Sequence, residues 1–389
     1  MEAAKKTCIG FDVGKSMHRA CAISHKTGEV LFNRALKNRA DVIDEVLKHA
    51  GTDALVIVDQ KHNIGSLVLE RARAVNMEVA YLPGLAMKRA RDMFPGIAKT
   101  DEIDAEVIAR TALGMPWTLR PISEDGATGS EIRLLGSQRR FLTRSIVQCK
   151  NRLRAVLLEI DPAFEAAINL GADWQIDIFK AFGGPAGIVS AGRRRYNTLA
   201  AKKSHVPTKT LEALWQAALT SSRSERQHTK AEDRLVRMLA ERIEEDARRS
   251  VVVNTDINIL LTENDTYQAL LTIPGIGPKT ASALVAGIDI SLFSSHDKLA
   301  SFVGLAPNNK QSGTSLNSAT SSRCGNKELK NLLIFSCNSL IGTKSRFGHY
   351  YEECRARNMR HNKALKAVAR KRLKIIYAVM RDARPYVEA

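Results

Sequence analysis

Apolar and polar positions alternate in blocks along the first third of the chain, and each block has the length of one strand or one helix. Short apolar runs of the kind that form buried strands occupy residues 7–14, 18–25, 28–35, 54–60 and 77–83. Amphipathic runs that predict helices occupy residues 40–51, 65–76, 86–94 and 100–110. Three strands joined by hairpin-length turns, followed by alternating helices and strands, predict an α/β domain over residues 1–120.

The middle of the chain, residues 121–265, changes to a helical pattern. After a Pro- and Gly-containing linker at 114–129, a long helix is predicted from Ser130, and from Leu142 its apolar steps run 4-3-4-3-4, like a coiled-coil seam. The apolar positions of this helix are Ile132, Leu135, Leu142, Ile146, Cys149, Leu153, Val156 and Ile160. A second charged helix is predicted at 224–249, and the Gly-rich stretch 183–195 reads as a loop. The seam needs a cover, either this second helix or a neighbouring subunit, so we expect a homo-oligomer, a dimer or a tetramer.

The C-terminal part, residues 266–389, is predicted to be mostly helical. It opens with "LLTIPGIGPKTASALVAGI", in which a Pro-Gly-Ile-Gly turn separates two helices, the pattern of a helix-hairpin-helix. Gly275 and Gly277 would expose backbone N–H groups at a helix N-terminus beside Lys279, where a DNA phosphate can bind. Any tight helix–helix turn with glycines gives a similar pattern.

Charge strengthens the case for nucleic acid. The chain has 59 Lys and Arg against 41 Asp and Glu, a net charge of +18, and a large share of the excess lies after Thr320. A solvated basic face or attraction to an anionic membrane would give the same count, but a concentrated basic surface favours nucleic acid. The cations expected to contact phosphates are Arg355, Arg357, Arg360, Lys363, Lys366, Arg370, Lys371, Arg372 and Lys374. On the same predicted helix the apolar set that should pack inward is Leu365, Val368, Leu373 and Ile376.

Composition excludes several classes of protein. Apolar residues make up 44% of the chain, which indicates a globular protein rather than a disordered one. No apolar run has the roughly 20 residues of a membrane span, and the N-terminus has no signal-peptide core. Six cysteines without a C-x-x-C pair indicate reduced thiols in a bacterial cytoplasmic, nucleoid-associated protein, and zinc is not expected.

Four aspartates form the candidate chemistry. Asp101 and Asp104 stand three residues apart on one face of a helical turn, which helix capping after Thr100 would explain on its own. Asp12 and Asp59, however, each end a predicted buried strand, where open sheets place their active sites. Four carboxylates converging there would repel one another unless cations lay between them, and hard oxygen ligands suit Mg²⁺ or Mn²⁺. Two such ions can clamp a phosphodiester during an in-line displacement.

Three segments carry a resemblance to a known family: "FDVGKSMH" around Asp12, "KTDEIDAEVIAR", and the C-terminal series "TIPGIGPKTASALVAGI", "GLAP" and "GNKELKNLL". Together they resemble the DEDD transposases of the insertion-sequence family known as IS-one-ten, which includes the Piv-type DNA invertases. The resemblance implies an N-terminal fold similar to RNase H and the RuvC resolvase, and a second transposase domain at the C-terminus. It further implies that Asp12, Asp59, Asp101 and Asp104 hold metal, and that a structured RNA encoded by the element guides target and donor choice.

The resemblance also implies a nucleophile. In that family a serine in a P-x-x-x-x-S-G segment attacks DNA, and the matching residue is Ser312, five positions after Pro307. From the residues alone, Ser312 is one of several serines in a loop before Gly313. A serine hydroxyl needs a base or a metal to activate it. The nearby sequence offers none, so we expect domain packing or a neighbouring subunit to bring Ser312 to the carboxylates. The chain departs from the family where "VDQKHNIG" supplies Asp59 in place of the usual glutamate.

Three hypotheses follow. The first is a site-specific DNA recombinase that mobilises an insertion sequence through a metal carboxylate site and a covalent phosphoserine. The second is a metal-dependent junction nuclease that uses water and no serine. The third is a nucleic-acid-binding protein with a vestigial acidic site. Dependence on the serine separates the first two hypotheses, and any metal-dependent strand cleavage removes the third.

Overall fold

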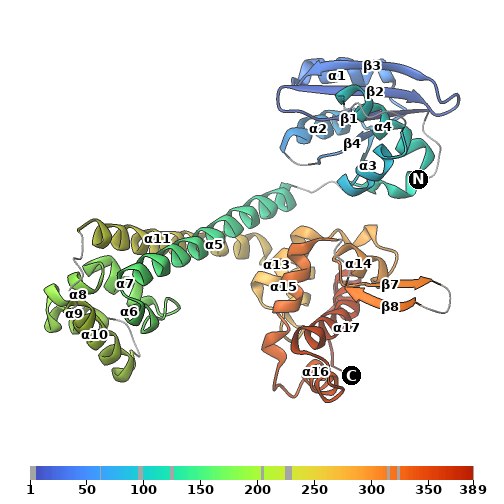
Figure 1. Ribbon diagram of the computed structural model, residues 1–389. Helices are drawn as coiled ribbons and strands as arrows, with labels where there is room; N and C mark the ends of the chain where they lie inside the picture. Colours follow the sequence, from blue (N-terminus) through green and yellow to red (C-terminus); the bar gives the residue numbers. More distant parts are fainter. Residues whose placement is uncertain are drawn as a thin grey trace. The chain divides into compact units, whose positions relative to one another are not determined.

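The chain is described by a computed structural model covering residues 6–61, 63–94, 100–122, 127–202, 206–223, 230–312, 316–321 and 325–388 (Figure 1). It divides into two compact units, Met1–Glu124 and Asp125–Ala389, which are taken in turn below. The finer division at 120 and 265 stays a prediction.

The first unit is built on a six-stranded mixed sheet with the strand order β3-β2-β1-β4-β5-β6. Neighbouring strands among the first three are antiparallel, β4 and β5 run parallel to β1, and β6 is antiparallel to β5. The strands are β1 (Thr7–Asp12), β2 (Met17–Ser24), β3 (Val30–Lys37), β4 (Ala54–Val58), β5 (Glu78–Tyr81) and β6 (Arg120–Pro121). The predicted strands are therefore confirmed, and with them the mixed α/β class of this unit.

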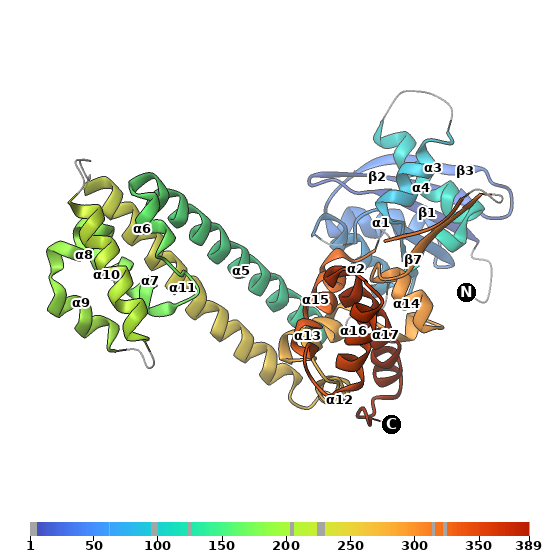
Figure 2. The same ribbon diagram turned by 60° about the horizontal axis from the view of Figure 1, so that its bottom comes forward.

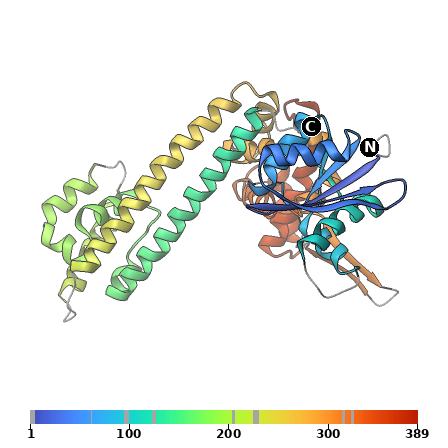
Figure 3. The same cartoon turned by 90° about the horizontal axis from the view of Figure 1, so that it is seen from above.

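Helices cover both faces of this sheet, as Figure 3 shows for blue α1 and teal α4. The helices are α1 (Ala40–Ala50), η1 (Asn63–Gly65), α2 (Ser66–Ala74), α3 (Gly84–Arg91), α4 (Asp101–Gly114) and η2 (Pro116–Thr118). Side chains alternate between the two faces of a strand. Accordingly, Ile9 and Phe11 of β1 pack with α1 and α2, whereas Cys8 packs with Ile108 of α4.

Helix α4 lies directly on β1 because of Gly10. A Cβ atom at Gly10 would stand 2.5 Å from the carbonyl oxygen of Ala105 and 2.6 Å from the backbone nitrogen of Ala109. Real Cβ contacts do not come this close, so any larger residue would push the helix off the sheet. The glycine therefore fixes how near α4 approaches the carboxyl end of β1.

One expectation for this unit is wrong in part. The stretch 114–129 was predicted to be a linker, but Arg120 and Pro121 pair with Tyr81 and Ala80 as the edge strand β6. Two residues are too short to show alternation in sequence, and proline is tolerated in a strand only at such an edge.

The second unit begins with a long antiparallel helix pair, α5 (Ala127–Ile160) and α11 (Lys230–Leu261), seen side by side in Figures 2 and 3. Two contacts show that the helices run antiparallel. Ser145 donates a 2.5 Å hydrogen bond to Asp246, while Ile132, earlier on α5, shares a core with Ile257, later on α11. The apolar seam of α5 is therefore covered by the second helix of the same chain, one of the two expected partners. Leu153 and Ile160, for example, are buried with α11 residues.

Between these two helices lie α6 (Pro162–Ala166), α7 (Asp173–Phe182), α8 (Pro185–Ala191), α9 (Arg193–Ala200) and α10 (Thr208–Ser222). The prediction of a loop at 183–195 is thus wrong, because two short helices, α8 and α9, occupy most of this stretch. Pro185 suits the first turn of α8, and Gly192, with φ +82°, separates α8 from α9. Ile188 and Tyr196 are buried, so packing stabilises two helices in a Gly-rich stretch whose composition predicted a loop.

The C-terminal part surrounds a second apolar core. Its elements are α12 (Asp265–Leu271), α13 (Pro278–Gly287), η3 (Ile290–Leu292), α14 (His296–Phe302), β7 (Pro307–Ser312), β8 (Leu316–Ser321), α15 (Lys327–Phe335), η4 (Asn338–Leu340), α16 (Arg346–Ala356) and α17 (His361–Asp382). The inward set predicted on the last helix is confirmed, since Leu365, Val368, Leu373 and Ile376 are all buried. Of the helices that the structure describes, none is long and apolar enough to pass through a membrane.

Candidate active site and nucleic-acid interface

Asp12 and Asp59 lie at the ends of two neighbouring parallel strands. Phe11 of β1 pairs with Val58 of β4, and the two aspartates follow this pair directly. Two residues earlier, Gly10 and Ile57 face α4. Because strand side chains alternate, Asp12 and Asp59 are placed on the α4 side of the sheet, at its carboxyl edge.

The first turns of α4 bring Asp104 to this edge. The side chain of Asp104 is 13% exposed, whereas Asp101, three residues earlier, is exposed. Burial raises the pKa of the Asp59 carboxyl, and the negative charge of Asp104 raises it further, while a hydrogen bond from the backbone N–H of Val13 lowers it. Asp59 and Asp104 are therefore close enough to repel each other. Asp12 ends the neighbouring strand on the same side of the sheet, and Asp101 is exposed on the first turn of α4.

An arginine that the sequence analysis missed neutralises part of this charge. Arg91, the last residue of α3, stands with its Nε 3.3 Å from Oδ1 of Asp104, and both side chains are largely buried. No sequence motif marks Arg91, since it lies among other basic residues at the end of its helix. Only the packing of α3 against α4 reveals the pair.

The N-terminus of α4 is held by its own contacts. The Thr100 hydroxyl accepts a hydrogen bond from Ile103 N, as predicted for an N-cap. Glu102 forms an ion pair with Arg19 of β2 at 3.1 Å, and its carbonyl accepts a 3.0 Å hydrogen bond from Asn33 of β3. Capping by Thr100 thus explains why the helix starts here, and Glu102 anchors it. Neither contact uses Asp104, which is left to face the sheet edge.

The donor set at this edge fits a divalent cation. Oδ1 of Asp59 is buried and has no hydrogen-bond partner in the part of the chain that the structure describes, and carboxylates are the hard ligands that Mg²⁺ and Mn²⁺ prefer. Within the same described residues, however, no three His, Cys, Asp or Glu side chains are gathered as a metal site. The ligand set Asp12, Asp59, Asp101 and Asp104 therefore remains a proposal.

Ser312 is the last residue of β7, in the C-terminal part of the second unit. Its backbone pairs with Leu316 of β8, so the residue predicted in a loop ends a strand of a two-stranded hairpin. Residues 313–315 lie outside the described residues, as does Cys324. Of the other cysteines, Cys8, Cys21, Cys337 and Cys354 are buried free thiols and Cys149 is a half-buried one.

The turn between α12 and α13 contains the predicted phosphate contacts. Gly275 has φ +78°, and a Cβ atom there would meet the Arg372 guanidinium at 2.7 Å, so both conformation and packing require glycine. Gly277 caps α13 with ordinary φ and has open space beside it. Gly277 and Lys279 are exposed at this helix N-terminus. The glycine pattern is explained by packing at one position and is compatible with a ligand at the other.

A cavity of about 300 Å³ adjoins this turn. It is lined by Arg139 and Thr143 of α5, Ser250, Asn254 and Asn258 of α11, and Pro278 and Lys279 of α13. Arg139 is 7% exposed and donates to the Ser282 hydroxyl at 3.1 Å, and burial lowers its pKa. The sequence analysis did not predict the burial of Arg139 beside the turn. A buried cation beside Lys279 and neutral polar groups favours an anion.

Most of the predicted basic residues of the C-terminal part are accessible. Arg355, Arg357, Arg360, Lys363, Arg370, Lys371 and Lys374 are exposed, and Lys366 is half-buried. Arg372 contradicts its prediction as a phosphate contact, since it is fully buried. Its guanidinium donates to the carbonyl oxygens of Pro274 and Leu333 at 3.2 and 3.3 Å. It therefore joins α17 to the glycine turn and to α15.

Comparison with known proteins shows which class of protein this chain belongs to. A family model described as "Transposase" matches residues 9–162, and one described as "Transposase IS116/IS110/IS902 family" matches residues 267–352. The two matched ranges contain the carboxylate edge and the C-terminal hairpin with Ser312. The protein is a DNA transposase, an enzyme of DNA recombination.

Full-length relatives make the assignment specific. The 43.6 kDa protein of insertion element IS110 from Streptomyces coelicolor is 33% identical over 386 residues, which cover 97% of this chain and 95% of the relative. The 44.8 kDa protein of IS116 from Streptomyces clavuligerus is 27% identical over 98% of this chain and 96% of the relative. The pilin gene-inverting protein of Moraxella bovis is 36% identical over 133 residues, 33% of this chain and 41% of that protein. The chain belongs to the IS116/IS110/IS902 family of transposases, and the family resemblance read from the sequence is confirmed.

Proposed function

We propose that this transposase is a site-specific recombinase that mobilises an insertion sequence in the bacterial nucleoid with a carboxylate metal site and a serine nucleophile. The observation that carries the proposal is the pairing of Asp59 with Asp104 at the carboxyl edge of the sheet. Burial, and in addition the charge of Asp104, raise the pKa of the Asp59 carboxyl, and such perturbed groups concentrate at functional sites.

The first unit supports an RNase H/RuvC-like assignment. Three antiparallel strands are followed by strands parallel to the first, with β1 and β4 adjacent in the sheet. Asp12, Asp59 and Asp104 would hold Mg²⁺ or Mn²⁺, with Asp101 at the rim. A divalent cation bound there would stabilise negative charge on the scissile phosphate. Arg91 would have to release Asp104 for this ligand set to form.

Ser312 would supply the nucleophile. Its Oγ would form a bond to phosphorus while one phosphorus–oxygen bond of the DNA strand breaks, and the Oγ proton would pass to a base. The leaving group is a deoxyribose hydroxyl, and the strand stays attached to the protein as a phosphoserine ester. Reversal with a different DNA hydroxyl would join the strand to a new partner.

Exposed apolar side chains support a homo-oligomer. Leu134 and Phe141 of α5 are 71% and 58% exposed, and Val252 and Ile259 of α11 are 56% and 66% exposed. The first pair is one heptad apart, and so is the second. A second copy that packs on these stripes would cover them. Basic helical faces would serve an element-encoded guide RNA as well as DNA, because both present phosphates.

One experiment separates this function from its two rivals. The protein is incubated with DNA carrying an element end and with Mg²⁺, then denatured, and the DNA that stays covalently attached is measured. We expect an adduct from the native protein, none from Ser312→Ala, and a normal amount from Ser318→Ala, a matched serine on the neighbouring strand. Cleavage without an adduct would establish the metal-dependent nuclease. The absence of both cleavage and adduct would establish a vestigial site.

A further inference from the structure

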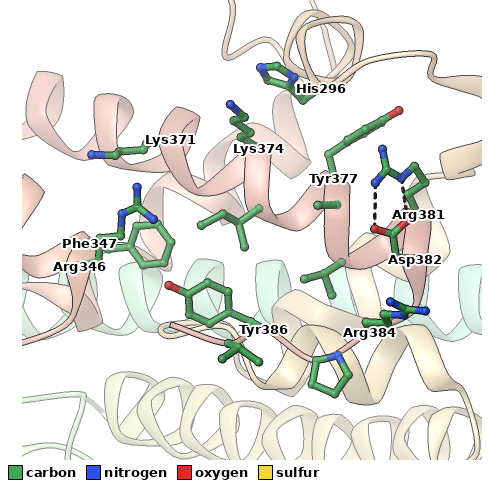
Figure 4. A pocket seen from close by; sticks show the side chains of 15 residues that line it. His296, Arg346, Phe347, Lys371, Lys374, Tyr377, Arg381, Asp382, Arg384 and Tyr386 are labelled. Carbon is green, nitrogen blue, oxygen red and sulfur yellow. Dashed lines mark hydrogen bonds and ion pairs between the residues drawn. The ribbon is translucent and has the colours of Figure 1, made fainter. Parts of the chain in front are cut away.

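A cavity lined by described residues lies at the C-terminal end of the chain (Figure 4). It has a volume of about 830 Å³ and lies between α17, the start of α16 and the tail after Asp382. The tail is fixed at two points: Tyr386 N donates to the Thr272 hydroxyl, and Glu388 accepts from Arg346 N, both at 2.7 Å. The cavity therefore has an ordered wall.

Cations dominate the rim of this cavity. Five of its lining residues are Lys or Arg and one is Asp, a surplus of four positive charges: Arg346, Lys371, Lys374, Arg381, Arg384 and Asp382. Asp382 is already paired with Arg381 at 2.7 Å. Lys371, Lys374 and Arg381 follow one another on one face of α17 at helical spacing. The rim is built for anions.

The floor of the cavity is apolar and partly aromatic. Ala378 stands in the middle of the basic face of α17, where its small side chain leaves room, and Ile375 and Val379 flank it. The rings of Phe347 and Tyr386 stack with centroids 6.3 Å apart. A site with an apolar floor and a cationic rim matches a ligand with one flat apolar part and one anionic part.

We propose that this cavity receives an unpaired base of a DNA strand, with the flanking phosphates on its cationic rim. A nucleotide combines a flat base with a phosphate, and proteins bind single strands by joining aromatic side chains to basic grooves. A paired base is stacked inside the duplex and cannot enter a cavity without leaving it. DNA is the occupant because the family acts on DNA, and strand exchange must unpair bases. This inference does not depend on the metal site or on Ser312.

The test measures binding by the full-length protein in EDTA, so that no cleavage intervenes. Two short duplexes are compared, one fully paired and one with a single unpaired 5-iodouracil, and the bound complex of the second is irradiated. We expect about tenfold tighter binding of the duplex with the unpaired base. We also expect the crosslinked base on a peptide that carries Tyr377 or Tyr386.

Three variants make the result specific. Ala378→Leu fills the floor without changing charge and should abolish the preference, while binding to the paired duplex stays within about twofold of the native value. Lys374→Gln, an exposed change that should not disturb folding, should reduce the preference. Lys363→Gln removes an equal charge from the same helix outside the cavity, and should weaken the binding of both duplexes equally.

Retention of the preference in both Ala378→Leu and Lys374→Gln, or a crosslink outside the cavity, would overturn the proposal. Tight binding of an RNA hairpin with the same unpaired base, together with no preference on DNA, would show that the occupant is RNA. Because the assay involves no strand cleavage, either failure leaves the proposed recombinase mechanism to its own test.

Discussion

The two ends of this chain handle charge in opposite ways. At the sheet edge of the first unit, like charges are crowded into one largely buried place, with Arg91 as the counter-ion of Asp104. On α16 and α17, most cations are spread over exposed helix faces, and Arg370, for example, pairs with Asp297 only at 3.8 Å. Crowding of buried carboxylates costs free energy and perturbs their pKa values, as at reactive sites. Cations spread over an exposed surface cost little free energy and give affinity for nucleic acid.

This difference predicts that the two regions control different measurable quantities. Changes at the carboxylate edge should alter the rate of DNA cleavage with little effect on DNA binding. Changes on α17 should alter binding and its salt dependence, with little effect on the rate once DNA is saturating. Four predictions test that separation, in order of decreasing effect.

The largest effect is expected from Asp104→Asn. The substitution keeps the shape but removes a negative charge from the proposed ligand set, so cleavage at saturating DNA should fall by about 10³-fold or more, because stabilisation of the developing charge is lost. Cleavage of labelled DNA in Mg²⁺ measures this. Glu102→Gln is the matched control: it removes a neighbouring charge of the same helix that pairs with Arg19, and it should retain most activity. Equal losses in both variants would contradict a special role for Asp104.

An intermediate effect is expected from the exposed cations. Replacing Arg360, Lys363 and Arg370 together with Gln should lower DNA affinity by about 10- to 100-fold near physiological salt. Each lost phosphate contact should flatten the slope of log affinity against log salt by about 0.9. Arg372→Gln is the contrasting change. It should leave the salt slope unchanged but lower thermal stability, because buried carbonyl oxygens lose their donor. An unchanged slope in the triple variant would remove this helix from the DNA interface.

A smaller effect, with an unusual sign, is expected from Asp59→Asn. Burial and Asp104 raise the pKa of Asp59, so the folded protein binds this proton more tightly than the unfolded chain does. In EDTA, its ionisation therefore reduces stability as pH rises from the ordinary aspartate pKa through the raised one. The Asn variant should lack that loss and melt at a higher temperature at neutral pH. Mn²⁺ should stabilise the native protein and not the variant, and Asp256→Asn, an exposed change on α11, should alter neither result.

The smallest effect is expected from Arg91→Met. Loss of the Arg91 guanidinium frees Asp104, so Mn²⁺ affinity measured by calorimetry should rise several-fold, while the metal-free protein loses some stability because two carboxylates are left uncompensated. A fall in metal affinity would indicate that Arg91 orients Asp104 for the metal rather than competing with it.

The sequence predicted the elements that depend on local pattern. Short apolar runs located β1 and β4 with their terminal aspartates, and Thr100 marked the start of α4. What it missed depends on contacts between distant segments. The pair of Arg91 with Asp104 needs two helices to be packed, and the burial of Arg139 and Arg372 needs a neighbouring helix or turn that supplies acceptors. Arginines read as surface cations from their charge alone can thus be structural, and only packing distinguishes the two roles.

Mass spectrometry of the trapped protein–DNA adduct tests the central claim, a serine nucleophile served by the carboxylate edge, most directly. Trypsin would release residues 311–323, a peptide with five serines, at positions 312, 315, 318, 321 and 322. Fragmentation of that peptide places the nucleotide on one of them. The account predicts a nucleotide ester on Ser312 in the native protein and no adduct in Asp104→Asn. An ester on another residue, or an adduct of undiminished yield in Asp104→Asn, would contradict it.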